Sequence, residues 1–83
     1  MRYTVVWIAT AEAALARLWM HAPDQNEITD AADRLDVALA TNPTQGARRM
    51  GPLFVKEDSP LAVLYQVNSG DCMVRVIAVK RIP

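Results

Sequence analysis

The sequence predicts an α+β fold in which a hairpin of two helices packs on a small, mainly antiparallel four-stranded sheet. Apolar residues recur at helical spacing in two stretches of the first half of the chain. The second half consists of β-branched and apolar runs separated by turn residues, and one more such run precedes the helices. The expected order is therefore β-α-α-β-β-β, in a single domain spanning residues 1–83.

The first strand is expected at Tyr3–Ile8, because the run is β-branched and aromatic. A helix should follow, with Thr10 as its N-cap and Glu12 in its first turn, where negative charge interacts well with the helix dipole. Pro23 should end this helix. The apolar stripe of the helix consists of Ala11, Leu15, Leu18, Trp19 and Ala22. We interpret Trp7 and Trp19 as core or interface anchors.

A second helix is expected from about Gln25 to Thr41. Asp24 followed by Glu27 resembles a capping box. The link between the two helices is so short that they should form an antiparallel hairpin, and Asn42–Pro43 should end the second helix. Its buried face should consist of Ile28, Ala31, Ala32, Leu35, Ala38 and Leu39.

Three further strands are expected in the second half. Leu53–Lys56 is a short one, and Glu57–Pro60 reads as a polar turn. The runs Leu61–Val67 and Cys72–Lys80 are apolar at nearly every position, which is typical of strands at the centre of a sheet. The polar stretch Asn68–Asp71 between them is a strong hairpin signal.

Charge is divided unevenly along the chain. Residues 1–45 carry three basic and six acidic groups, a net charge of −3, and residues 46–83 carry six basic and three acidic groups, a net charge of +3. An anion-binding role therefore belongs to the second half. The overall neutrality argues against strong nonspecific binding of nucleic acid, which requires many phosphate contacts.

Disulfide bonds, metal sites, cofactors and membrane segments are not expected. Cys72 is the one cysteine and His21 the one histidine, so the sequence offers neither a disulfide framework nor a metal site. We expect no cofactor, no signal peptide and no membrane association, and hence a reduced, cytoplasmic protein. A domain this small buries only roughly 60% of its unfolded surface, so a partner should add needed burial.

Two apolar segments of the second half, separated by a polar turn, together form a motif. Residues 61–67 read Leu-Ala-Val-Leu-Tyr-Gln-Val, and after a polar turn residues 74–81 read Val-Arg-Val-Ile-Ala-Val-Lys-Arg. The passage from residue 33 to Pro43, followed by Gly46 and Arg48-Arg49, adds to the pattern. This sequence resembles the RelE/ParE superfamily of toxins, in which a strand of the type R-V-x-Y-x-V precedes a turn and V-x-V-x-x-V-x-x-R.

The resemblance implies a toxin of a type II toxin–antitoxin module, of the kind associated with plasmid stabilization and neutralised by a cognate antitoxin. RelE-like members are mRNA interferases, which cleave mRNA on the ribosome without a metal, whereas ParE-like members poison DNA gyrase. The ribosome with its mRNA, or gyrase, is therefore the implied target. A homodimer and a toxin–antitoxin heterotetramer are both open as assemblies. We expect the antitoxin to cover exposed apolar surface along the sheet and the helix hairpin.

Metal-free RNA cleavage needs a group that activates the ribose 2′-hydroxyl, a cation for the charged transition state and an acid for the leaving oxygen. The family supplies these largely with arginines and lysines on the sheet. Here the arginine that opens the third strand falls on Ala62, and no tail tyrosine occurs before Pro83. Glu57 and Asp58 are the available bases but are expected in a turn. The candidate catalytic residues are Lys56, Lys80 and Arg81, and the candidate RNA-binding residues are Arg48 and Arg49.

Three hypotheses follow from the sequence. The first is a ribosome-dependent mRNA endoribonuclease, supported by the resemblance and the basic second half. The second is a toxin-fold protein without nuclease activity, either a gyrase inhibitor or a catalytically degenerate antitoxin-binding subunit, which the loss at Ala62 favours. The third is an unrelated small α+β interaction module.

Overall fold

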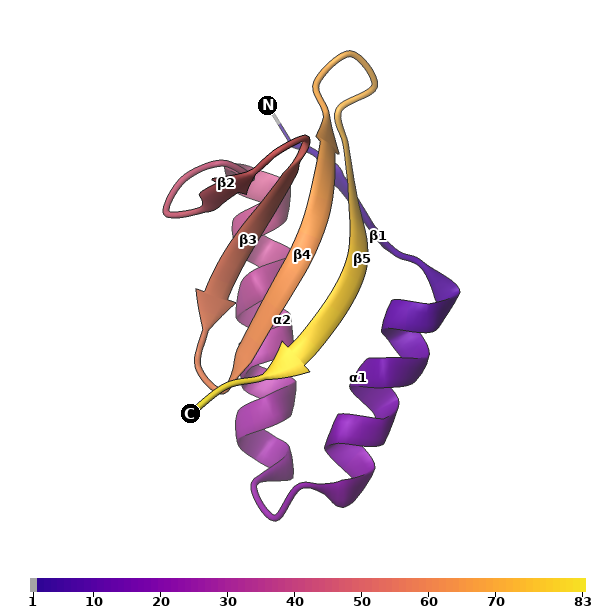
Figure 1. Ribbon diagram of the computed structural model, residues 1–83, viewed down its shortest axis with the longest axis vertical. Coiled ribbons are helices and arrows are strands. Elements are labelled where there is room, and N and C mark those ends of the chain that lie inside the picture. The colour runs from indigo at the N-terminus through magenta and orange to yellow at the C-terminus, as the bar shows by residue number, and fades with distance from the viewer. Residues whose placement is uncertain (1) are drawn as a thin grey trace.

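The computed structural model describes residues 2–83 and contains two helices and five strands in the order β1, α1, α2, β2, β3, β4, β5 (Figure 1). The strands form one mixed sheet in the spatial order β1-β5-β4-β3-β2, in which β1 runs parallel to β5 and the other pairs are antiparallel. The predicted α+β class is confirmed. The elements are β1 Thr4–Trp7, α1 Ala9–His21, α2 Gln25–Thr41, β2 Arg48–Met50, β3 Leu53–Asp58, β4 Leu61–Asn68 and β5 Met73–Arg81.

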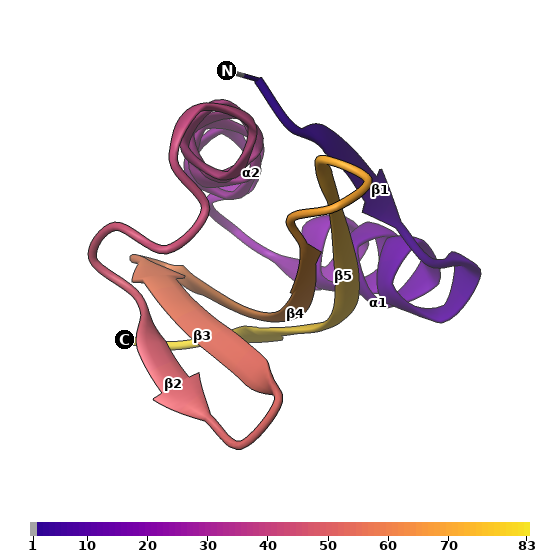
Figure 2. The same ribbon diagram turned by 90° about the horizontal axis from the view of Figure 1, so that it is seen from above.

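The two helices form the expected hairpin and leave one side of the sheet open. In Figure 1, α2 runs behind β3 and β4, and neither helix covers the side of the sheet that faces the viewer. Figure 2 shows how strongly the sheet curves, with α2 on the inside of the curve. The sheet therefore has a helix-covered face and a face without helices.

The core lies between the helix-covered face of the sheet and the apolar stripe of α2. The most apolar strands, β4 and β5, are the third and second in the sheet and so lie inside it, as predicted. Alternate residues of each strand point to the same face. The large, fully buried side chains are Leu61, Val63 and Tyr65 of β4, Val74 and Val76 of β5, and Ile28, Leu35 and Leu39 of α2.

The pairing of β4 with β5 shifts by one residue at a β-bulge. Tyr65 is opposite Val76, but Leu64 is opposite Ala78, so Ile77 has no partner in the ladder. An extra residue reverses the facing of everything that follows it on that strand. As a result Val79 packs against the core, and Ala78 and Lys80 face the uncovered side.

The sheet has one strand more than predicted. β2 consists of Arg48–Met50, and all three of its residues are exposed, so the apolar pattern that marks the other strands is missing. β3 also continues to Asp58, so Glu57 and Asp58 belong to a strand and were wrongly assigned to the turn. The turn is confined to Ser59–Pro60, whose peptide bond is cis.

Helix boundaries were predicted better than helix caps. α2 has the expected range, Gln25–Thr41. α1 begins at Ala9 after the N-cap Ile8, so Thr10 is not the cap, and neither helix has a side-chain cap hydrogen bond. Asp24 does occupy the N-cap position of α2, but its carboxylate binds Arg81 instead of the helix N-terminus. Within residues 2–83, neither helix is long and apolar enough to cross a membrane.

Candidate functional site

The uncovered side of the sheet is hollowed over β2 to β5. The hollow has a volume of about 430 Å³. Along each of these four strands, every second residue faces this side of the sheet, as the strand registers show. All four strands therefore contribute side chains to the hollow. We call this surface the open face and define it by Arg48, Met50, Val55, Glu57, Ala62, Leu64, Ala78 and Lys80.

Three charged side chains surround the hollow. Glu57 of β3 and Lys80 of β5 are both paired with Ala62 of β4, so these three residues form one row across the sheet. Arg48 of β2 donates a hydrogen bond to Glu57, with 3.1 Å between Nη2 and Oε2. Because more than half of each partner is exposed, solvent screens this ion pair and its contribution to stability is small.

Ala62 lies at the centre of that row, where the resemblance leads one to expect an arginine. Its side chain is only 3% exposed, although it faces the open side, because the neighbouring strands enclose it. A methyl group here supplies no positive charge. The middle of the open face is therefore apolar, with charges only at its margins.

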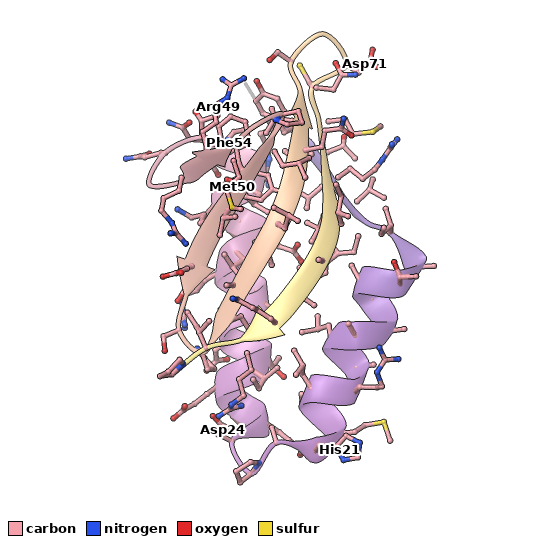
Figure 3. The ribbon with its side chains drawn as sticks, in the orientation of Figure 1. His21, Asp24, Arg49, Met50, Phe54 and Asp71 are labelled. Atoms are coloured by element: carbon pink, nitrogen blue, oxygen red, sulfur yellow. The ribbon has the colours of Figure 1, made fainter. Side chains whose placement is uncertain are left out.

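Two of the five candidate cations, Arg48 and Lys80, lie on the open face, and the other three lie elsewhere. Lys56 is opposite Val63 of the core and donates from Nζ to the carbonyl of Gln45 at 2.8 Å. The guanidinium carbon of Arg49 lies over the ring of Phe54, 5.6 Å from its centre. Figure 3 labels both residues at the end of the sheet near β2. The five candidate residues therefore do not lie together on one surface.

Arg81 has a structural role at the end of β5. It donates from Nη2 to Oδ2 of Asp24 at 2.7 Å, which ties the last strand to the start of α2. The hydrogen bond from Arg81 is the main reason that the pKa of Asp24 lies below its ordinary value of 3.8. The same bond raises the pKa of Arg81. Lys80 and Arg81 are neighbours on one strand, so they face opposite sides of the sheet.

Glu57 is the site residue that the sequence interpretation set aside. The run Glu-Asp-Ser-Pro looks like a turn by composition, so the end of β3 was not predicted. Alternation from Val55 would have placed Glu57 on the same face as Val55, and the strand pairings place Arg48 and Lys80 on that face too. The open face thus combines one carboxylate with two cations.

The remaining polar candidates lie outside this site. His21 is in the last turn of α1, at the hairpin end of the molecule (Figure 3). Cys72 precedes β5 and has a positive φ of 49°. Among the described residues, no group of three or more His, Cys, Asp or Glu side chains could hold a metal ion.

No protein-family model matches this sequence, and no curated protein matches it either. Solved structures do match. A chain of the toxin–antitoxin complex RelBE2 from Mycobacterium tuberculosis superposes with a TM-score of 0.79 and 20% identity, over 98% of this chain and 99% of that one. A chain of the chromosomal ParDE system of P. aeruginosa gives a TM-score of 0.71 and 14% identity, over 99% and 98%.

The isolated RelE toxin of E. coli is also similar, with a TM-score of 0.67 and 18% identity, over 98% of this chain and 85% of that one. At these identities the comparison establishes a common fold and does not carry over the role of any side chain. The hairpin of helices and the curved sheet are shared along almost the entire chain in each case.

Proposed function

Because this chain has the fold of RelE- and ParE-type toxins, we propose that it is the toxin of a type II toxin–antitoxin module and is neutralised by a cognate antitoxin. The main support is the match to chains of RelBE2 and ParDE, which covers nearly the full length of this chain and of each matched chain. Those proteins are components of toxin–antitoxin systems. The cytoplasm, where gyrase and ribosomes are found, is the compartment that this proposal requires.

Growth and complex formation test the module. Expression of this chain alone in a bacterial host should arrest growth, and co-expression of the neighbouring short gene should restore it. The two products should also co-purify as a stable complex. Normal growth of the induced cells, together with no complex, would contradict the proposal.

Between the two implied activities, the geometry favours a toxin that acts by binding over one that cleaves RNA. A metal-free nuclease concentrates positive charge where the phosphorane-like transition state forms. The open face has two cations, and Arg48 is already paired with Glu57. Ala62 leaves the centre without a positive charge. Gyrase is the target that this reading implies.

RNA cleavage is the second candidate, and the placement of Glu57 and Lys80 on either side of one position of β4 supports it. In this mechanism Glu57 takes the proton of the ribose 2′-hydroxyl, whose oxygen then attacks the adjacent phosphorus. Arg48 stabilises the charge on the phosphorane-like transition state. Lys80 donates a proton to the leaving 5′-oxygen, leaving a 2′,3′-cyclic phosphate on the upstream fragment.

Two assays on the purified protein separate the candidates. The binding toxin should inhibit supercoiling by gyrase and leave ribosome-bound mRNA intact. The nuclease should cleave that mRNA, and Glu57→Gln or Lys80→Ala should lower its rate by roughly 100-fold or more. Arg75→Ala is the matched control, because Arg75 is exposed on the same strand as Lys80 but outside the hollow. Inhibition of gyrase without RNA cleavage would dismiss the nuclease.

A further inference from the structure

Another hollow lies between the C-terminal half of α1 and the end of β5, with a volume of about 750 Å³. β1 pairs with β5 only as far as Val76, so the rest of β5 has no strand on its outer side. Figures 1 and 2 both show α1 alongside β5. We call this hollow the edge groove and define it by Arg17, Leu18, His21, Val79, Lys80 and Arg81.

The charged side chains that line the edge groove are all basic. Arg17 and His21 are one helical turn apart, so they lie on the same side of α1. Lys80 and Arg81 face opposite sides of the sheet, and both line the groove because it opens at the outer edge of their strand. Among residues 2–83, no acid lines it. The groove therefore brings together three cations and a histidine from two elements that are far apart in the sequence.

Most of this positive charge is uncompensated. Three ion pairs occur in the described part of the chain, and neither Arg17 nor Lys80 takes part in one. Arg81 is held by Asp24 through Nη2, which leaves its other guanidinium N–H groups for a ligand. A guanidinium that is already fixed loses little side-chain entropy on binding, and its fork of donors matches the oxygens of a phosphate. The groove is therefore preorganised for an oxyanion.

The remainder of the lining is apolar and indicates the size of the ligand. Leu18, Pro23 and Val79 belong to it. A hollow of this volume, apolar apart from a few convergent polar groups, is typical of a small-molecule site. A nucleic-acid strand requires many cations along an extended path, whereas this protein as a whole is neutral. The edge groove therefore suits a compact anion that also carries an apolar group.

We propose that the edge groove binds a small phosphate monoester that carries an apolar or aromatic group. The phosphate oxygens accept hydrogen bonds from Arg17, Lys80 and Arg81. The apolar group packs on Leu18 and Pro23. This inference goes beyond the proposed function, because the ligand is neither an antitoxin nor the cellular target of a toxin.

An NMR titration of the isotope-labelled chain tests the inference, with phenyl phosphate, inorganic phosphate and phenol as probes. Phenyl phosphate should shift the amide signals of residues around the edge groove. Its Kd should be at least roughly 10-fold lower than that of inorganic phosphate, because the ring adds apolar contact. Phenol lacks the charge and should bind at least roughly 10-fold more weakly than phenyl phosphate.

Variants distinguish the edge groove from the open face, because Lys80 lines both. Arg17→Ala and Lys80→Ala should each weaken the binding of phenyl phosphate by roughly 10-fold. Arg48→Ala removes the other cation of the open face and should leave this binding unchanged. Arg75→Ala is the matched control for a lost charge, because Arg75 is exposed on β5 outside both hollows. Circular dichroism melting checks that each variant is folded.

Several outcomes would overturn the inference. These are no binding of phenyl phosphate, equal binding of phenyl phosphate and inorganic phosphate, and binding that Arg48→Ala weakens but Arg17→Ala does not. A single-stranded RNA of about 10 nucleotides that binds more tightly than phenyl phosphate, and loses this binding in Arg17→Ala, would also overturn it. The groove would then be part of a nucleic-acid path.

Discussion

Tyr65 is the largest of the fully buried side chains, and it takes a hydroxyl group into the core. Its hydroxyl donates a hydrogen bond to the carbonyl of Pro43, just after the end of α2. Its ring stacks on Phe54, with 5.9 Å between the ring centres. One side chain therefore connects β4 to the neighbouring strand and to the loop that follows α2.

Tyr65→Phe should lower the free energy of unfolding by about 1 kcal/mol, because the carbonyl of Pro43 loses its donor. Burial raises the pKa of Tyr65 from 10.0 to about 12, so the neutral hydroxyl contributes stability that is present below pH 10 and lost as the pH rises toward 12. Urea unfolding between pH 8 and pH 12 measures both effects. The phenylalanine variant should lack this alkaline loss.

Asp24→Asn tests the connection between β5 and α2. Arg81 lowers the pKa of Asp24 below 3.8, so the carboxylate stabilises the fold above that pH and stops doing so as the pH falls through the lowered value. The wild type should therefore be more stable than the variant at pH 6, and the difference should shrink as the pH falls below 3.8. In an Arg81→Met background the difference at pH 6 should shrink, and an unchanged difference there would rule out this explanation.

Secondary structure elements were predictable where composition and burial agree. The range of α2 and the two apolar strands β4 and β5 followed from patterns that match their burial. β2 was missed because an exposed edge strand needs no apolar residues. Thr10 was expected as a cap on local chemistry alone, but β1 ends at Trp7 and the helix begins two residues later, at Ala9.

The candidate site was only partly predictable, for a related reason. Arg48 and Lys80 do share a face, but Lys80 and Arg81 were grouped because they are neighbours in sequence, and strand geometry separates such neighbours. The facing of Lys80 also depends on the bulge at Ile77, which no composition signal marks. Placing Glu57 on this face required knowing that β3 continues to Asp58.

Deleting Ile77 should remove the bulge without turning the end of β5 over. Ala78 and Lys80 would keep their partners Leu64 and Ala62, so Lys80 would still face the uncovered side and Val79 would stay in the core. Inserting an alanine between Ala78 and Val79 should instead move Val79 out of the core, at a cost of roughly 2 kcal/mol for the apolar burial alone. The midpoint of urea unfolding should fall more for the insertion than for the deletion, and equal losses would contradict this account of the register.

In the whole molecule, negative and positive charges belong to different structural elements. The helices and β1 come from the half with a net charge of −3, and the other four strands come from the half with a net charge of +3. The hollow between α1 and α2, which Glu12, Asp33 and Asp36 line, and the open face consequently differ in charge as well as in position.

A chain of 83 residues should be marginally stable by itself and gain much from the antitoxin that we propose. At an antitoxin concentration 100 times the Kd, binding adds about 2.7 kcal/mol to the free energy of unfolding. For a domain of this size that corresponds to a rise in Tm of roughly 10 to 20 °C. Differential scanning calorimetry of the free and bound protein measures it, and an unchanged Tm would argue against an antitoxin that binds the folded state.

The parallel pairing of β1 with β5 affects how the protein is made. β1 hydrogen-bonds to no strand other than β5, so the first strand of this sheet has no place in it until the last strand has emerged from the ribosome. Closing a loop of that length is slow compared with forming the helix hairpin. The five-stranded sheet is therefore complete only once β5 has left the ribosome, although the helix hairpin can form before that.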